Sequence, residues 1–474
     1  MPTVDLITFR RPGDLDDSPA FQRAIDAVAA AGGGMVRVPA GRFRLSTTVF
    51  LSSNVHVAGG GMDRTSVLFD SVAPEQMTAE PRMGILRSSA FVAAGRCPDD
   101  VYPAGSKELG DYYISAPGPL SGLVAAGSVF IPVASAASLE DIRAGDWVQL
   151  LEGQSGWHPA KSELVRVEAV SSGGLRLATP TDNLYDSGPE GLGAFIERYD
   201  RPANPPGGAR IDLWARTGFR RVEPVENAGL SAMTIANVNE ITGYGGRAYL
   251  FVRSVGCFAH DVRLTGGWAW HLDSQDVSCR LDMRGDLARA SVGAMFNGSN
   301  RIRASIRSRE GSLVVEEGAQ RLVLEQSTFD LTRANIVIGH YCAGITFRNI
   351  AVTNSQSFGI SIYKSRNVTI GGSIVAAGAA IRYDTPYPLA QAAQPPAVAP
   401  YFDGAEITLD HCELRSTRNP GYDLWLEQPI RAVASVLTGE HGEPFMADGR
   451  GHGVPLLGSL VRRADGRQFG GARR

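Results

Sequence analysis

The chain has 474 residues, a formal net charge of −3 and an isoelectric point near 6.3. This balance, without a basic stripe that carries interleaved aromatic residues, argues against nucleic acid as a partner. No run of about 18 apolar residues is present, so the sequence predicts no membrane-spanning helix and no membrane partner. The chain is long for one compact core, but a repeat protein escapes that limit because each repeat packs only on its neighbours.

The five cysteines are scattered, without a Cys-x-x-Cys pair or a spacing typical of metal ligands. Cys257, Cys279 and Cys342 alternate with apolar residues, which predicts that they pack in a core. The sequence therefore predicts no cofactor, and no motif supports a calcium site. Residues 1–13 lack a charged start followed by an apolar stretch. Three locations stay open: the cytoplasm, a phage particle, and secretion with the signal removed.

An amphipathic helix is predicted within residues 14–34. Asp17 or Ser18 can cap its start, and Pro19 suits its first turn. The apolar face is formed at i, i+3, i+4 and i+7 by Phe21, Ala24, Ile25 and Val28. Glycines 32–34 end the helix. Such a helix is suited to cover the open end of a stack of strands and to protect its unpaired edge.

The same segment resembles the N-terminal signature of the pectate-lyase-like superfamily. There, Asp-Asp-Ser/Thr is followed by an amphipathic helix, Gly-Gly-Gly, a Val-rich strand, Pro-x-Gly and another strand. The matching residues are Asp16-Asp17-Ser18, Ala24-Ile25, Gly32 to Gly34, Val36, Val38, Pro39 and Gly41, and residues 53–61 resemble the next coil. The resemblance implies a right-handed parallel β-helix. The family includes polysaccharide lyases, glycoside hydrolases and phage tailspike depolymerases, so the resemblance also implies a polysaccharide or oligosaccharide partner.

Residues 127–185 have a different sequence pattern, in which predicted strands are separated by Gly and Ser turns and do not follow the period of the coils. This pattern predicts a small antiparallel β insertion. Five prolines at 385–402 predict an extended loop. The predicted organisation is an N-terminal cap with the first coils at 1–85, loops and the β insertion at 86–222, the main coils at 223–430, and an irregular C-terminal segment at 431–474.

Residues 268–384 contain short runs of alternating apolar residues at an interval of roughly 20–25 residues, which is typical of stacked β-coils. The predicted inward rows are Trp270, Ala294, Leu313, Ile336 and Ile360, and beside them Leu272, Phe296, Val315, Ile338 and Ile362. No helical spacing separates the runs. The predicted fold is therefore all-β: a right-handed parallel β-helix, a solenoid with an N-terminal capping helix and a small β insertion.

Outward-facing residues then align along one side of the stack. One column reads Asp273, Asn297, Glu316, Gly339 and Tyr363, and the adjoining turn position reads Ser274, Gly298, Glu317, His340 and Lys364. We predict as catalytic residues His340, Tyr363, Lys364, Glu316, Asp273 and Arg382, and as substrate-binding residues His271, Asn297, Glu317, Arg366 and Asp384. Exposed strands need polar residues in any case, so a solvated charged face is the alternative interpretation.

β-Elimination from a uronic acid is the first mechanism that suits this face. It needs a cation to neutralise the carboxylate and acidify the proton at C5, a base for that proton, and an acid for the leaving oxygen. Lys364, Arg366 and Arg382 can supply charge, and His340, Tyr363 or Lys364 can exchange the proton. His340 and Tyr363 are predicted to lie about 5 Å apart on adjacent coils. Within the family, lyases of the alginate and dermatan type use a Lys and an Arg on this face.

Hydrolysis by two carboxylates is the second mechanism. Asp273 and Glu316 are predicted two coils apart, about 9.6 Å between backbones, which suits an inverting pair with room for water. A lyase is placed first and an inverting hydrolase second. The remaining alternatives are a non-catalytic glycan-binding or tailspike-like protein, for which a homotrimer is expected, and a sugar epimerase or isomerase.

Overall fold

The computed structural model describes most of the chain. The described residues are 1–70, 89–97, 118–155, 158–199, 217–237, 246–285, 292–330, 336–384, 407–416, 424–426, 431–439, 445–447, 456–457 and 460–463. The loop predicted at 385–402 lies outside them. Within the described ranges, no helix has the length and apolar character that crossing a membrane requires.

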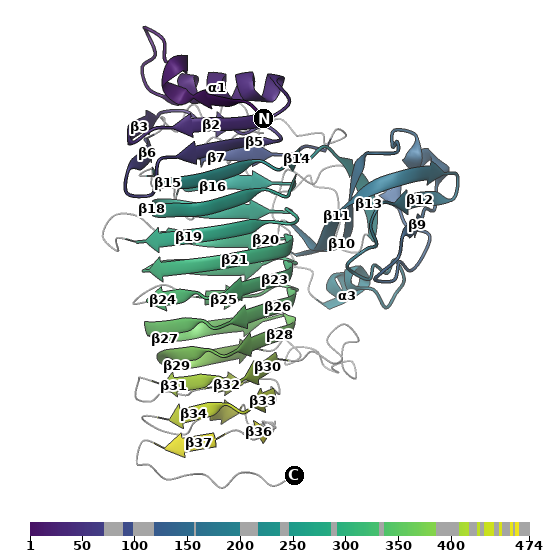
Figure 1. The fold of residues 1–474 in the computed structure, drawn as a ribbon. Coiled ribbons are helices and arrows are strands. Elements are labelled where there is room, and N and C mark those ends of the chain that lie inside the picture. The colour runs from purple at the N-terminus through teal and green to yellow at the C-terminus, as the bar shows by residue number, and fades with distance from the viewer. Residues whose placement is uncertain are drawn as a thin grey trace.

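Most strands stack into one long column, with the N-terminal coils at one end and the last described strands at the other (Figure 1). The first coils contain β1 (Thr3–Asp5), β2 (Gly34–Val38), β3 (Gly41–Leu45), β4 (Val49–Phe50), β5 (Val55–Gly59), β6 (Thr65–Phe69) and β7 (Ser89–Ala94). The next coils contain β14 (Val225–Glu226), β15 (Gly229–Asn237), β16 (Arg247–Val252), β17 (Ser254–Val255), β18 (Phe258–Leu272), β19 (Ser278–Arg284), β20 (Val292–Asn297), β21 (Asn300–Arg309), β22 (Gly311–Glu316) and β23 (Gln320–Glu325).

The column continues in the same way to the last described strand. Its remaining strands are β24 (Thr328–Asp330), β25 (Ile336–Ile338), β26 (Ala343–Arg348), β27 (Ala351–Tyr363), β28 (Arg366–Gly371), β29 (Ile374–Asp384), β30 (Ile407–Asp410), β31 (Glu413–Ser416), β32 (Leu424–Leu426), β33 (Arg431–Val433), β34 (Val436–Gly439), β35 (Phe445–Ala447), β36 (Leu456–Leu457) and β37 (Leu460–Arg463). The sequence predicted an irregular segment at 431–474, whereas the described parts of 431–463 form strands that pair in parallel with earlier coils.

The pairing within the column is parallel throughout, and each coil lies in register on the next. On one sheet the inward row reads Ala269, Ala294, Leu313, Ile336, Ile360 and Ile381, and the next inward row reads His271, Phe296, Val315, Ile338 and Ile362. These rows are buried and belong to one continuous apolar core. The prediction of an all-β parallel β-helix is confirmed. All five cysteines are free and buried, as predicted for Cys257, Cys279 and Cys342.

The predicted register is wrong by one residue in the first coil of this series. Ala269 and His271 face the core, whereas Trp270 and Leu272 lie on the outer side of β18. Gly267, inside β18, has a positive φ of 81°, and the alternation of inward and outward residues is interrupted there. The outer side is also apolar here, because Trp270 and Leu272 pack with Leu250, Val252 and Met295. Hydrophobicity therefore did not distinguish the two faces.

Helix α1 (Ser18–Ala30) lies across the N-terminal end of the column (Figure 1). Its buried face includes Phe21, Ala24, Ile25 and Val28, as the spacing predicted. The predicted side-chain cap differs in detail, because Asp17 makes no cap hydrogen bond. The Asp17 carboxylate instead accepts a bond from the backbone N–H of Arg44 at 2.9 Å, which attaches the helix to β3.

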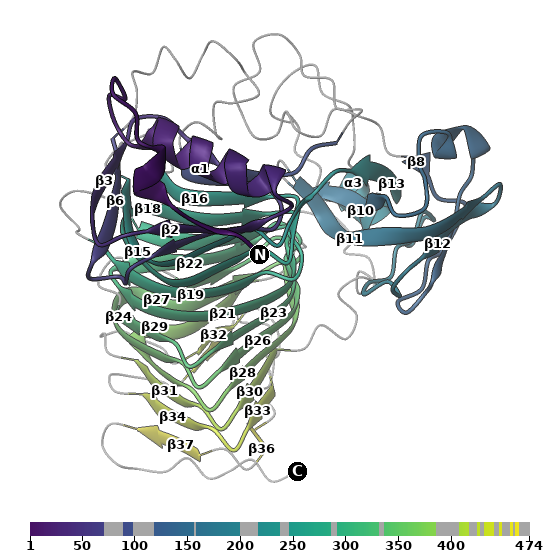
Figure 2. The same cartoon turned by 45° about the horizontal axis from the view of Figure 1, so that its top comes forward.

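The predicted insertion is a six-stranded antiparallel sheet with its own apolar core. Its elements are β8 (Gly118–Pro119), β9 (Phe130–Pro132), β10 (Trp147–Ser155), β11 (His158–Ser171), β12 (Gly174–Leu177), β13 (Thr217–Val222) and the helix α3 (Leu192–Tyr199). Figure 2, with the N-terminal end turned toward the viewer, shows the insertion beside the column. The insertion leaves and re-enters the column at one point, where Arg96 and Glu223 exchange backbone hydrogen bonds of 3.0 and 2.8 Å.

Strand β11 and its neighbours bind the insertion to the column. The Gln275 amide accepts from the Leu164 N–H at 2.9 Å and donates to the Leu164 carbonyl at 2.5 Å. The Asp182 carboxylate pairs with Arg301 at 2.9 Å and with Arg321 at 2.8 Å, two arginines from successive coils. The insertion therefore spans more than one coil.

We expect Ile338→Ala to destabilise the column by about 2–5 kcal/mol, because it leaves a cavity in a fully buried row. The matched control is Val337→Ala on the outer face of the same strand, with an expected loss of about 1 kcal/mol or less. Guanidinium denaturation followed by circular dichroism measures both. Equal losses would contradict the inward placement of Ile338.

Candidate functional site

The predicted site residues lie where one strand of each coil ends and the chain turns. In five successive coils the residue at this corner has a positive φ: Asp273 (47°), Gly298 (58°), Glu317 (52°), His340 (55°) and Lys364 (47°). The preceding position faces outward from the strand and reads Leu272, Asn297, Glu316, Gly339 and Tyr363. The fold therefore concentrates ionisable groups along one edge of one sheet, and we call these two columns the corner site.

Three of the predicted catalytic residues are in direct contact across three coils. The Tyr363 hydroxyl donates a hydrogen bond to the Glu316 carboxylate. The His340 ring packs edge-on against the Tyr363 ring, with centroids 5.0 Å apart and planes at 80°. This matches the spacing predicted from the coil repeat. Nδ1 of His340 is buried and has no hydrogen bond partner among the described residues.

Gly339 makes the contact between Tyr363 and Glu316 possible. It lies in the coil between them, and the Tyr363 ring covers it so closely that a Cβ at position 339 would lie 2.3 Å from the ring. With hydrogen there instead of a side chain, Tyr363 reaches across one whole coil to its carboxylate partner. The glycine is thus required by the close approach and not by its backbone angle.

Burial changes the acidity of this group. Burial raises the pKa of Glu316, although the hydrogen bond from Tyr363 and the nearby His340 partly oppose that rise. Burial also raises the pKa of Tyr363, and the Glu316 charge adds to it. Tyr363 is therefore held in its protonated form as a hydrogen-bond donor.

Asp273 lies at the corner of the coil that precedes the coil of Asn297. Its carboxyl group is buried, and neither oxygen has a hydrogen bond partner among the described residues. Burial raises its pKa well above the usual range, and the charge of Glu317 raises it further. The prediction placed Asp273 in the column of Glu316, but the one-residue slip in β18 puts it in line with Gly298 and Glu317. The carboxylate that faces Asp273 along the stack is therefore Glu317.

Asn297 links the Glu317 carboxylate to Trp270 on the outer face of the sheet. Its amide nitrogen donates to the Glu317 carboxylate at 2.9 Å, and its oxygen accepts from Nε1 of Trp270 at 3.0 Å. Asn297 and Glu317 were predicted as substrate-binding residues, and the structure brings them together. Trp270 was predicted to face the core, so the sequence missed its role in orienting Asn297.

Strand β11 of the insertion forms one wall of the corner site. The Ser162 hydroxyl donates to the Gly298 carbonyl at 3.2 Å. Gly318 lies so close to the Ala160 carbonyl that a Cβ there would be 2.3 Å away. Lys161, between them, forms a buried ion pair of 2.5 Å with Glu152. Burial lowers the pKa of Lys161, and the charge of Arg366 contributes to that decrease, which places Arg366 near this wall.

No family model matches the chain. Two curated relatives from Azotobacter vinelandii match it over 84 residues: mannuronan C5-epimerase AlgE3 at 38% identity and alginate lyase 7 at 37%. Each match covers 16% of this chain, and it covers 4% of the epimerase and 9% of the lyase. The chain thus spans only a small part of the curated relatives.

A search of solved structures finds extended likeness. The tailspike gp61 of Pseudomonas phage phi297 superposes with a TM-score of 0.53 at 12% identity, covering 97% of this chain and 76% of that one. The chain therefore has the fold of a right-handed parallel β-helix. At this identity the likeness concerns the fold of the β-helix alone, and the N-terminal resemblance predicted the same fold.

His271 is not at the surface of the β-helix, so its prediction as a substrate-binding residue is wrong. It is fully buried, stacked on Phe296 at 5.0 Å, and its Nε2 lies 3.0 Å from the Tyr249 hydroxyl. Burial lowers its pKa to about 3. The cause of the error is again the slip in β18, which exchanges the inward and outward positions.

Four other predicted residues are placed by their backbones. Lys364 is the corner residue after Tyr363, and Arg366 follows at the start of β28; both are half-buried. The backbone of Arg382 pairs in register with Ser361, and that of Asp384 pairs with Tyr363. The side chains of Arg382 and Asp384 lie outside the described part.

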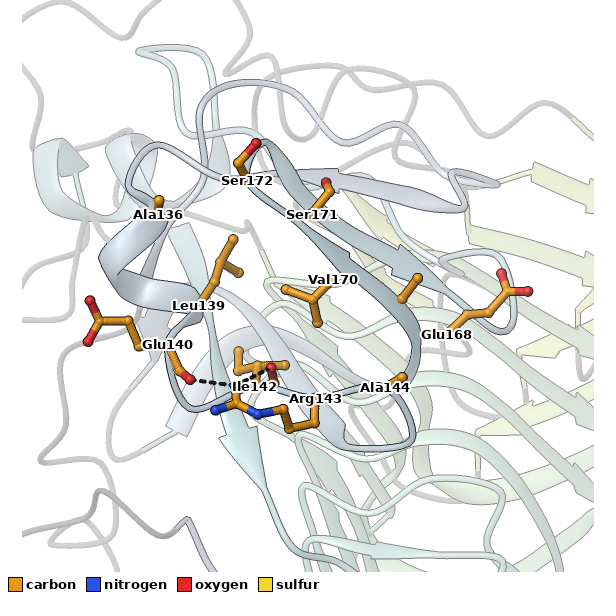
Figure 3. Close-up of a pocket in the computed structure, with 11 residues that line it drawn as sticks. Ala136, Leu139, Glu140, Ile142, Arg143, Ala144, Glu168, Val170, Ser171 and Ser172 are labelled. Atoms are coloured by element: carbon orange, nitrogen blue, oxygen red, sulfur yellow. Dashed lines mark hydrogen bonds between the residues drawn. The ribbon is translucent and has the colours of Figure 1, made fainter.

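The insertion carries a separate hollow, which is distinct from the corner site (Figure 3). It is lined mainly by small and apolar side chains such as Ala136, Leu139 and Val170, with Arg143 bonded to the Glu140 carbonyl at its edge. It contains none of the corner-site residues. Across the described ranges, no three His, Cys, Asp or Glu side chains gather as a metal would need.

We expect the stability advantage of Asp273→Asn over the natural protein to grow as pH rises above about 4. The unfolded carboxyl ionises near its ordinary pKa, while the folded one, with a raised pKa, resists ionisation, so the folded state loses stability with rising pH until its own pKa is passed. Melting temperatures between pH 4 and 8 measure this, with Asp26→Asn on α1 as control. If the difference in melting temperature between Asp273→Asn and the natural protein stays constant or decreases as pH rises, Asp273 is ionised in the folded protein.

Proposed function

We propose that this chain acts on an acidic polysaccharide by removing the proton at C5 of a uronic acid residue, with β-elimination of the glycosidic bond as the outcome. The observation that carries the proposal is the contact of His340, Tyr363 and Glu316 across three coils. An imidazole, a phenol and a carboxyl group in contact can exchange protons on one side of a bound sugar.

The roles follow from the acidity of each group. The His340 imidazole takes the C5 proton. The electron pair of that C–H bond forms the C4–C5 double bond, and the bond between C4 and the glycosidic oxygen breaks. Tyr363, kept protonated by burial and by Glu316, gives its proton to the departing oxygen. Glu316 orients the hydroxyl of Tyr363 through their hydrogen bond.

The C5 proton becomes acidic enough only if the uronate carboxylate is neutralised. Lys364 follows Tyr363 directly, and Arg366 lies two residues further along the same coil. The backbone of Arg382 lies in the next coil, in register with Ser361. These cations along one edge are suited to hold the carboxylate and to stabilise the negative charge that develops beside C5.

The curated relatives support the same first step. One is named for C5 epimerisation of mannuronan and the other for lysis of alginate. Both reactions begin with loss of the C5 proton and differ in their second step: return of a proton to the other face gives an epimer, and loss of the C4 oxygen gives an unsaturated end. Epimerisation is therefore the alternative outcome at the same site.

Hydrolysis by an inverting mechanism is a second candidate, supported by Asp273 and Glu317. They are two coils apart, about 9.6 Å between backbones, and inverting carboxyl pairs are usually separated by about 6.5–9.5 Å. The raised pKa of Asp273 suits a general acid. Glu317, bonded to Asn297, would be the base that activates water.

Incubation with alginate in D₂O, followed by proton NMR, tests the proposal. We expect loss of the C5 proton signal together with new vinyl signals, because elimination leaves a double bond. His340→Gln and Tyr363→Phe should each lower the rate about 10²–10⁴-fold, since each removes one proton-transfer group. His411→Gln, an exposed histidine elsewhere on the column, is the matched control and should retain the full rate.

The other outcomes discriminate between the candidates. Exchange at C5 with a changed sugar configuration and no vinyl signal would identify an epimerase. New reducing ends without vinyl signals, lost in Glu317→Gln, would identify a hydrolase. The absence of any change across a panel of uronic acid polymers would contradict an enzymatic role on such substrates.

A further inference from the structure

A second charged surface lies on a different face of the column from the corner site. It is formed where β18, β19, the second half of β21 and β24 pair side by side. The surface is hollowed into a groove with a volume of about 310 Å³. We call it the arginine groove, and its charged lining residues are Arg263, Arg280, Arg284, Arg307, Asp261 and Asp282.

The coil register aligns these charges. Arg263, Asp282, Arg307 and Thr328 are outward partners on four successive coils, about 4.8 Å apart at each step. Arg284 and Arg309 form a parallel pair two residues further along the same strands. Arginines, Asp282 and Thr328 therefore alternate along the axis of the column, and polar groups follow one another in the direction in which an extended ligand would lie.

Asp282 holds two of the arginines in fixed positions. It accepts a hydrogen bond from Nε of Arg263 at 2.8 Å and one from Nε of Arg284 at 3.2 Å. Burial by itself would raise the pKa of Asp282, but the bonds from Arg284 and Arg263 outweigh it and lower that pKa. The carboxylate therefore stays ionised and orders the guanidinium groups, as a preformed binding site needs.

The groove has more positive than negative charge. Arg307 and the adjacent Arg309 are both exposed, and among the described residues no acidic side chain pairs with either of them. Four arginines and two aspartates line the groove itself, and Asp63 forms an ion pair with Arg263, which leaves a difference of one positive charge (4 − 3). Exposed guanidinium groups bind carboxylates through two parallel hydrogen bonds.

We propose that the arginine groove is a second, non-catalytic binding site for an acidic polysaccharide. This proposal rests on the proposed function only because it assumes that the groove binds the same acidic polysaccharide as the corner site. The mixed lining favours a polyuronate, which carries a single carboxylate on each sugar and many hydroxyls. The hydroxyls can bond Asp261, Ser305, Gln326 and Thr328, which also line the groove. Duplex DNA, with one negative charge per about 1.7 Å of helix axis, would instead bring a dense row of phosphates against two fixed aspartates.

Electrophoresis in gels that contain alginate tests the proposal. All proteins carry Tyr363→Phe, so that the polymer stays intact. The parent protein is expected to be retarded, and the double variant Arg284→Ser, Arg307→Ser should bind about tenfold more weakly, because two charge-assisted bonds are lost. Added salt should weaken the parent more than the variant. The charge-matched control is Arg166→Ser, Arg176→Ser, two exposed arginines of the insertion.

A second measurement separates this site from the corner site. In proteins with Tyr363 intact, the double variant should keep the parent's rate of C5 exchange on short oligouronates, which the corner site alone can bind. If no exchange of the C5 proton is seen but retardation by alginate still depends on Arg284 and Arg307, the binding site in the groove is supported and the proposed function is contradicted. The proposed binding site is overturned if alginate does not retard the parent protein, or if it retards the parent and the double variant equally. It is also overturned if duplex DNA retards the parent more strongly than alginate does.

Discussion

The parallel register between coils is the constraint on which the rest of the structure depends. Each strand bonds to its equivalent one turn of chain later, with about 4.8 Å between them. The length of the turn can vary, but the register at the strand cannot slip without moving the whole inward row to the surface. Side chains tens of residues apart in sequence are thereby fixed as neighbours, and both the corner site and the arginine groove are rows of this kind.

The chemistry of the corner site comes from departures within that regular stack. A coil that presents Gly339 leaves room for the ring of Tyr363 to cross it and reach Glu316. The insertion contacts the same corners through Ser162 and Ala160, and Asp273 is buried there. Burial raises the pKa of Asp273 and of Glu316, so both carboxyl groups resist ionisation.

The sequence predicted the architecture because period and composition agreed over many coils. From Ala294 to Ile360 the predicted inward rows are those observed, and the proximity of His340 to Tyr363 followed from the coil spacing alone. The prediction for His271 failed because the alternation is interrupted at Gly267 and the outer face is apolar in that coil. The contacts of β11 with Gly298 and Gly318 are long-range, and no local pattern could indicate them.

The insertion begins at Arg96 and ends at Glu223, and these two residues exchange a pair of backbone hydrogen bonds. The coils before and after that junction continue in register with each other, since β15 pairs with β5 and β6, and β16 pairs with β7. The column, which carries the corner-site residues, and the insertion, which forms one wall of that site, are thus separate units of one polypeptide. Under the proposed function, a change in the insertion would alter which polymer fits, while the acids and bases on the column keep their places.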